Sequence, residues 1–292
     1  MKHQNFLALA LCLAASAAMP GAAQAGTFIG LGQPGPAGWS IQLYPTWHQP
    51  LQSPTSAFSF VELSYFTPTG FTGTARDRHQ FWAAAALGYA TPAPRGDDRA
   101  TGVMGQQLAY EYYYNAIERR TAHGLSWWTT PYIAITVPNG DTKASGFGAG
   151  GNQHSYLLGW NNHFGWDKWS ITFAPVLLSY ADRSRHADAA PADGAGPVRA
   201  RAGLSLTLAD LAIGYRVSPE LDLGVHHSYS LYNRGHSDFA ASRQARVGPS
   251  FAYHGLMQTH RIYLAGNLSV DYLASPGLKR TTTLSAVLVK FF

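Results

Sequence analysis

Apolar and polar side chains alternate along residues 259–272. Ile262, Leu264, Leu268 and Val270 occupy one set of alternate positions, and the set between them is mostly polar. A period of two predicts an extended strand, because successive side chains point to opposite faces of a sheet. The segment is longer than an ordinary strand of roughly 5 to 6 residues, and it reaches the roughly 9 to 11 residues that a tilted strand needs to cross a bilayer.

The same alternation recurs throughout residues 39–292. In one segment, for example, Val61 and Leu63 alternate with Glu62 and Ser64. We therefore predict an all-β fold, a single transmembrane antiparallel β-barrel of about 12 strands over residues 39–292. The alternative is a secreted β-sandwich. A sandwich would present charge on its polar face, whereas the polar positions here are rich in Gly, Ser, Asn and Tyr, as in a water-filled lumen.

Two of the predicted strands change phase in the middle. The apolar positions shift by one residue near Pro175, and again at Ala209-Asp210. One extra residue in a strand moves every later side chain to the opposite face. We therefore predict a β-bulge at each place rather than the end of a strand.

The lengths of the connections predict the orientation of the barrel. Short joins, such as those at residues 165–167 and 218–220, alternate with long polar ones at residues 138–152, 182–197 and 233–244. Outer-membrane barrels have short periplasmic turns and longer extracellular loops, so we expect the long connections to be extracellular. The join at residues 68–78 is the exception, because it is longer than the other predicted periplasmic turns.

The amino-terminal residues predict export. Lys2, an apolar run over residues 6–18 and the small residues of Ala23-Gln24-Ala25 indicate a signal peptide over residues 1–25 that is cleaved. Cys12, the only cysteine, lies within it, so the mature chain would have neither a disulfide nor a zinc ion bound by cysteine. Residues 26–38 form a short lead rich in Gly and Pro. It is too short for a plug domain, so we expect any gate to come from the loops.

Composition favours a barrel whose outer face meets lipid. Charged residues make up 13% of the chain, against roughly 25% in an ordinary soluble domain, and aromatic residues also make up 13%. We therefore expect the outer membrane of a Gram-negative bacterium as the location and its lipid as a partner. The formal charge of +5 is small and dispersed, so we expect no nucleic-acid partner.

The carboxyl end indicates how such a barrel is assembled. The chain ends at Phe291-Phe292, with Leu284 and Leu288 in the phase of Phe292. This ending resembles the terminal-Phe signal that the barrel-assembly machinery reads in Gram-negative outer-membrane proteins. The resemblance makes Phe292 the candidate signal residue and that machinery a partner. Lys290 departs from the apolar phase, and we expect its ammonium group to extend to the periplasmic interface.

The predicted polar face supplies the candidate residues of the lumen. Both charge signs occur there, with aromatic hydroxyl groups between them. A ring of one sign would select ions by charge, whereas mixed signs favour pairing within a narrow lumen that passes small, uncharged or weakly polar solutes. The alternative is that these groups only satisfy one another in a closed barrel. The candidates are Glu62, Gln107, Glu111, Tyr113, Asn161, His163, Asp222, His226, Ser228, Arg261, Asn267 and Asp271.

His226 and Ser228 raise the possibility of catalysis. Outer-membrane phospholipase A and the lipid A deacylases carry a similar His-x-Ser pair, in which the histidine activates the serine for acyl transfer. That chemistry acts on lipid, so the pair would have to face outward. Here both residues share the phase of Asp222, which directs them into the lumen, and Tyr229 replaces the Asn that follows the serine in those enzymes.

Other motifs give little support for a metal or a cofactor. The 12 histidines are scattered, and the adjacent His226 and His227 point to opposite faces of a strand. The glycine-rich residues 140–151 lack the Lys-Ser/Thr ending and the helix of a phosphate-binding loop. We therefore expect no metal site and no cofactor.

A family resemblance adds an expected function. Residues 132–141 form a strand that ends in Pro-x-Gly, and residues 161–179 contain a Gly-Trp turn. With the hairpin at residues 215–229, this pattern resembles the outer-membrane proteins named for the meta-pathway of phenol degradation and their SphA-like relatives. The resemblance spans residues 124–292 and implies passage of hydrophobic or aromatic small molecules. The role is similar to that of FadL-type fatty acid channels, although the short lead cannot supply their hatch.

We therefore expect a passive channel or uptake port for small hydrophobic or aromatic molecules, and not an enzyme. One alternative is a non-conducting structural or adhesive barrel that acts through its extracellular loops, chiefly residues 182–197 and 233–244. The other alternative is a lipid hydrolase that uses His226 and Ser228.

Overall fold

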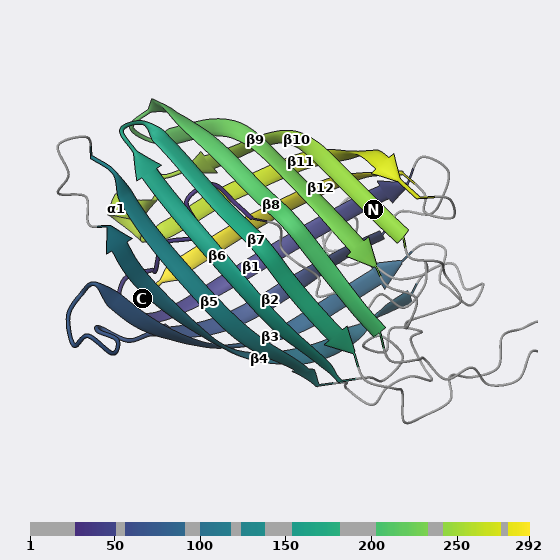
Figure 1. Ribbon diagram of the computed structural model, residues 1–292, viewed down its shortest axis with the longest axis horizontal. Helices are drawn as coiled ribbons and strands as arrows, with labels where there is room; N and C mark the ends of the chain where they lie inside the picture. The colour runs from purple at the N-terminus through teal and green to yellow at the C-terminus, as the bar shows by residue number, and fades with distance from the viewer. Residues whose placement is uncertain are drawn as a thin grey trace, which may run out of the picture.

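The computed structural model describes residues 27–50, 56–90, 100–117, 124–137, 154–181, 203–232, 242–275 and 280–292. Within these ranges, twelve antiparallel strands form one closed barrel, because β1 pairs with β12 as well as with β2 (Figure 1). The strands are β1 (Gly38–Pro50), β2 (Ser56–Phe66), β3 (Asp77–Ala90), β4 (Ala100–Ile117), β5 (Ser126–Val137), β6 (Ser155–Trp166), β7 (Trp169–Ala181), β8 (Gly203–Ser218), β9 (Leu221–Tyr232), β10 (Ser242–Tyr253), β11 (Ile262–Ala274) and β12 (Thr281–Phe291). In the described part of the chain, no helix has the length and apolar character needed to span a membrane.

The two faces of the barrel wall differ as the alternation predicts. On the outer face Leu63 exposes 49% of its surface and Leu158 exposes 55%, while their neighbours Glu62 and Leu157 are buried inside. An apolar outer face of this kind is stable in contact with lipid, and closure satisfies the backbone groups that an edge strand would leave unpaired. The predicted all-β barrel is confirmed.

Both predicted bulges are present. Asn162 of β6 pairs with Phe173 of β7, but Trp160 pairs with Val176, so β7 has one residue more than β6 across this stretch. The register between β8 and β9 also shifts at residues 209–210, where Ala209 has a left-handed φ of 51°. Each strand continues through its bulge with the inward and outward positions exchanged.

The start of β11 differs from the prediction. The alternation predicted a strand from Thr259, but residues 257–260 form the short helix α1 (Met257–His260), and β11 begins at Ile262. Arg261 ends the helix in a left-handed conformation with φ 53°, and its N–H group donates to the carbonyl of Met257 at 3.1 Å. Arg261 is therefore exposed in a turn, and its predicted position in the lumen is wrong.

The long join between β2 and β3 is held by one carboxylate. Asp77 accepts hydrogen bonds from the backbone N–H groups of Gly70 and Thr72, at 3.2 and 2.9 Å, and from the hydroxyl group of Tyr112 at 2.7 Å. These bonds fold residues 67–76 into a compact turn. The unusual length of this predicted periplasmic join is thus compatible with a defined structure.

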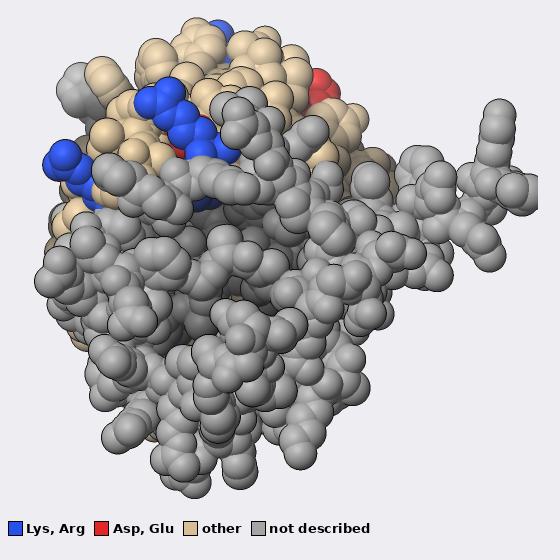
Figure 2. All heavy atoms as spheres, turned by 90° about the vertical axis from the view of Figure 1, so that its right-hand side faces the viewer, with Lys and Arg blue, Asp and Glu red and all other residues tan. Residues whose placement is uncertain are grey.

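The two ends of the barrel differ in their connections. Gly38 and Phe292 lie at the end with the turns at residues 167–168 and 219–220, which the predicted orientation makes periplasmic. The Lys290 ammonium group donates to the carbonyl of His260 at 2.5 Å at this end of the barrel. The opposite end carries the two longest connections, those between β5 and β6 and between β7 and β8. From that end most of the described surface is neutral, with only a few charged side chains in view (Figure 2).

Candidate functional site

The described part of the lead, residues 27–37, lies inside the barrel. Thr27 receives support from two strands: its N–H and hydroxyl groups donate to Asp210 of β8 at 3.2 and 3.0 Å, and Asn267 of β11 donates to its carbonyl at 3.0 Å. Asp210 and Asn267 are both near the middle of their strands. The lead therefore begins at about half the depth of the barrel and runs to the periplasmic end, where β1 starts.

The next residues of the lead are packed against small side chains. Phe28 and Ile29 have no exposed surface, and the hydroxyl group of Tyr263 donates to the carbonyl of Ile29. The wall here carries Ala212 and Gly214, and a Cβ atom at Gly214 would lie 2.6 Å from the Cγ2 atom of Ile29. These small residues create the space that the lead occupies.

The lead then crosses to other strands before it joins β1. Gln33 Nε2 lies 2.7 Å from His163 Nε2 on β6, and Arg78 of β3 donates to the carbonyl of Gly35 at 2.6 Å. Gly35 is also pressed against the ring of Phe291, because a Cβ atom at Gly35 would lie 2.2 Å from that ring. Contacts with several strands around the barrel show that the lead spans the lumen. The expectation from the sequence was that any gate would come from the loops; the lead is a further segment that lies across the lumen.

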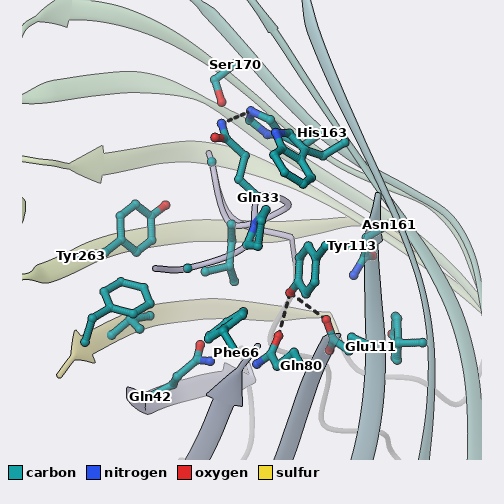
Figure 3. Close-up of a pocket in the computed structure, with 18 of the residues that line it drawn as sticks. Gln33, Gln42, Phe66, Gln80, Glu111, Tyr113, Asn161, His163, Ser170 and Tyr263 are labelled. Atoms are coloured by element: carbon teal, nitrogen blue, oxygen red, sulfur yellow. Dashed lines mark hydrogen bonds between the residues drawn. The ribbon is translucent and has the colours of Figure 1, made fainter. Parts of the chain in front are cut away.

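A cavity of about 590 Å³ remains beside the lead. Its lining extends from Leu157 and Leu177 in the interior to the β6–β7 turn at the periplasmic end, and residues 30, 31 and 33–36 of the lead form part of its wall. The volume is within the range of roughly 300 to 1,000 Å³ that is typical of small-molecule sites. Figure 3 shows its polar groups, which come from the lead and from strands on opposite sides of the barrel.

One wall of this cavity is a continuous hydrogen-bond network across β1 to β4. Gln42 donates to Glu62 at 2.7 Å, and Gln80 donates to the same carboxyl oxygen at 3.2 Å. The hydroxyl group of Tyr113 lies 2.8 Å from both Gln80 Oε1 and Glu111 Oε2 (Figure 3). The network holds the two glutamates of β2 and β4 in fixed positions on the cavity wall.

Aromatic rings provide much of the remaining surface of the cavity. The rings project from one arc of the barrel, from β11 through β12 and β1 to β5; they belong to Tyr44, Phe60, Phe66, Trp82, Trp128, Tyr132, Tyr263 and Phe291. Trp82 also donates to Glu111 Oε1 at 3.0 Å. Rings with polar edges can contact apolar molecules with their faces while their N–H and O–H groups remain hydrogen-bonded.

The structure places most of the predicted lumen residues inside the barrel, but in different surroundings. Those that line the cavity are Glu62, Gln107, Glu111, Tyr113, Asn161, His163 and Asp222. His226, Asn267 and Asp271 are buried elsewhere in the interior, and Ser228 is half-buried. Asp271 accepts from Gln244 at 2.7 Å and from the N–H and hydroxyl groups of Thr281, which joins β10, β11 and β12.

Several residues of the site were not among the candidates. Gln42, Gln80 and Trp82 line the cavity from β1 and β3, and Gln33 belongs to the lead. Gln42, Gln80 and Trp82 share the inward phase of their strands, so the alternation contained the signal for these three. Nothing in the periodic pattern indicates Gln33, because the lead has no period of two.

His226 is not paired with Ser228. Its ring nitrogens lie 2.8 Å from Asp210 Oδ1 and 3.2 Å from the hydroxyl oxygen of Ser269. All three side chains are buried inside the barrel, and His226 is not part of the cavity lining. His226 is buried inside the barrel, and this position places its ring away from lipid.

No metal centre is evident in the described part of the interior. Among the described residues, no three His, Cys, Asp or Glu side chains are close enough together to bind a metal ion. Three predicted segments lie entirely outside the described residues: the signal peptide at 1–25, the glycine-rich residues 140–151 and the loop residues 182–197.

Comparisons with known proteins identify the same architecture. No protein-family model and no curated protein matches this sequence. Among solved structures, the COG4313 outer membrane channel from Pseudomonas putida F1 aligns with a TM-score of 0.68 and 14% identity over 91% of this chain and 100% of that one. The β-domain of the Bordetella autotransporter BrkA aligns with a TM-score of 0.51 and 12% identity over 87% of this chain and 99% of that one. The fold of this chain is therefore that of an outer-membrane β-barrel, which agrees with the predicted location.

Proposed function

We propose that the protein is a passive outer-membrane channel or uptake port for small hydrophobic or aromatic molecules. The observation that carries this proposal is the cavity of about 590 Å³ inside the barrel, with its aromatic lining and its hydrogen-bonded polar wall. A barrel that served only as a scaffold would gain stability from filling this space with side chains, because protein interiors are normally close-packed. The Pseudomonas putida protein of the same fold is described as an outer membrane channel, which is in keeping with this role.

The lead is the gate in this proposal. It narrows the lumen, and hydrogen bonds with Asp210, Asn267, Tyr263, His163 and Arg78 hold it there. Segments outside the strand ladders can open locally at a fraction of the free energy of global unfolding. A solute would enter the cavity when the lead shifts, and it would leave by diffusion without coupling to an energy source.

The direct test is the permeability of the refolded barrel. We expect discrete openings in planar bilayers, and flux of a small aromatic solute such as benzyl alcohol into proteoliposomes. Removal of residues 27–33 should increase both, because it deletes the part of the chain that lies across the lumen. Heat-modifiable mobility on gels would verify that both proteins are folded.

Two outcomes would reject the proposal. If neither protein gave conductance or solute flux above that of empty vesicles, the barrel would not be a channel. If the full chain conducted and the shortened chain conducted no better, the lead would not be the gate, although the channel would remain.

The hydrolase alternative receives no specific support from these contacts. The histidine that it requires is bonded to Asp210 and Ser269 in the interior, so it is separated from membrane lipid by the barrel wall.

A further inference from the structure

The acidic side chains of the barrel interior belong to two groups. Three of them contact a basic side chain, with the following distances between nitrogen and oxygen atoms: Asp210 and His226, 2.8 Å; Asp222 and Arg216, 2.9 Å; Asp271 and Arg246, 3.5 Å. Glu62 and Glu111 form the second group. Within the described residues, neither of them has a basic partner.

Only neutral groups donate to these two glutamates. Glu62 Oε1 accepts from Gln42 Nε2, from Gln80 Nε2 and from the hydroxyl group of Ser64, while Glu62 Oε2 accepts none in the described part of the chain. Glu111 accepts from Trp82 Nε1 and from the hydroxyl group of Tyr113. Placing two ionised carboxylates in the barrel interior without a counter-charge is unfavourable. A cationic ligand would remove that penalty.

The surroundings of these carboxyl groups suit an organic cation better than a hydrated metal ion. Both glutamates line the cavity, together with the aromatic rings of Tyr44, Trp82 and Tyr132. The faces of such rings attract cations, and the attraction is strongest where water is excluded. Basic groups of the lining, such as Lys168 and Arg216, belong instead to the periplasmic end, where Arg216 is already paired with Asp222.

A separate side chain also indicates a ligand. Ser170 of β7 lines the cavity and exposes only 9% of its surface, yet its hydroxyl oxygen has no hydrogen-bond partner. It lies on the side of the cavity that holds Gln33 and His163 (Figure 3). Buried hydroxyl groups normally have a hydrogen-bond partner, so Ser170 offers a hydrogen bond to any cation that carries a second polar group at its far end.

We propose that the cavity binds small organic cations with an aromatic or apolar body, of the chemical class of benzylamine and benzyltrimethylammonium. The ammonium group lies against the wall of Glu62 and Glu111, and the body contacts the aromatic rings. This inference rests on the proposed channel function and adds a charge preference to it: cations are favoured over neutral molecules of the same shape, and anions are excluded.

The test compares three solutes of similar size and different charge. Benzylamine, benzyl alcohol and benzoate would be added at neutral pH to the full-length barrel in a planar bilayer, and block of the ionic current would be measured for each. We expect benzylamine to block at a concentration about tenfold lower than benzyl alcohol, because cation–π contacts and a carboxylate partner together supply a preference of this order. Benzoate should not block.

Substitution of the glutamates identifies the site. Glu62→Gln and Glu111→Gln, made separately, keep the size of the side chain and should each weaken the block by benzylamine while leaving the effect of benzyl alcohol unchanged. Glu220→Gln is the matched control, because Glu220 is exposed in the β8–β9 turn and does not line the cavity. It removes the same charge and should leave the block unchanged.

The outcomes separate this inference from the proposed function. Equal effects of the three solutes on an open wild-type channel would overturn the charge preference and leave the channel role intact, and this comparison does not depend on any variant folding. A preference for benzylamine that both glutamine variants retain would overturn the assigned site. A barrel without conductance or flux of any kind would reject the proposed function itself.

Discussion

Gly214 shows how one missing side chain shapes the interior. Its position on β8 faces the lead, and the side chain of Ile29 occupies the space that a Cβ atom would need. Burial of a side chain of this size contributes about 1.5 to 3 kcal/mol. The docking of the lead therefore depends on residues that make no polar contact. The sequence pattern did not predict them as residues of the lumen.

Gly214→Val should displace Ile29 and shift the lead away from the wall. We expect a rise of about tenfold or more in the open fraction of the channel, in proportion to the lost burial free energy. Single-channel recordings would measure the open fraction. The double variant Gly214→Val/Ile29→Ala should recover part of the closed fraction, because the smaller side chain leaves room for valine. No recovery would show that the valine acts through the barrel wall rather than through Ile29.

For single residues, the sequence predicted which side chains face inward better than it predicted their hydrogen-bond and ion-pair partners. The alternation indicates that Glu62 and Asp222 both face inward, and both line the cavity. It does not indicate that Asp222 has an arginine partner and that Glu62 has none among the described residues, because these partners depend on which strands are adjacent and on their register. Gln33 was beyond prediction for a different reason: its contact with His163 is made by a segment without regular secondary structure.

Among the elements, β8 best illustrates how a local irregularity positions a functional contact. Asp210 faces inward and holds Thr27 because the bulge at Ala209 exchanges the two faces of the strand at this point. Ala209 has a φ of 51°, which is unfavourable for a residue with a side chain and more so for one that is β-branched.

The bulge leads to a prediction about stability. Ala209→Val should lower the free energy of unfolding, because it adds the crowding of a β-branched side chain to the roughly 1 to 2 kcal/mol that alanine already loses in the left-handed region. Ala209→Gly should be nearly neutral, since the relief of strain is offset by the greater freedom of glycine in the unfolded chain. Urea titrations in detergent would compare the variants. Equal midpoints for valine and glycine would contradict this account of the bulge.

The strands could be predicted wherever apolar and polar residues alternate. At α1 the same alternation led to a wrong assignment, because it predicted a strand where the chain forms a helical turn. Thr259 and Arg261 continue the alternation of β11 by coincidence, although a helical turn precedes the strand. Four residues are too few for a helical period to be visible in the sequence. Met257 packs against the apolar cluster inside the barrel, and this tertiary contact stabilises a turn that the local pattern does not reveal.

The barrel as a whole depends on its apolar outer surface. Leu268 lies near the middle of β11 and exposes 45% of its surface, whereas Val217 lies near the periplasmic end of β8 and exposes 52%. The cost of a charged residue on the lipid face varies with depth: about 2 to 4 kcal/mol at the centre of the bilayer and about 0 to 1 kcal/mol near its surface.

Leu268→Arg should therefore destabilise the barrel in liposomes by about 2 to 4 kcal/mol, and Val217→Arg by about 1 kcal/mol or less. Unfolding in denaturant, followed by tryptophan fluorescence, would measure both. Similar losses for the two variants would show that Leu268 does not lie at the centre of the bilayer. In detergent micelles, where arginine can reach water at most positions, the difference between the variants should diminish.

The position of Thr27 also determines where a purification tag or a label can be attached to the protein. Any residue that precedes Thr27 continues from a point bonded to Asp210 and Asn267, at about half the depth of the barrel. A purification tag fused directly before the lead must therefore occupy the lumen or thread out of it, and at the other end of the chain Phe292 is the candidate assembly signal. Labels placed in the long connections opposite the periplasmic end would leave both features undisturbed.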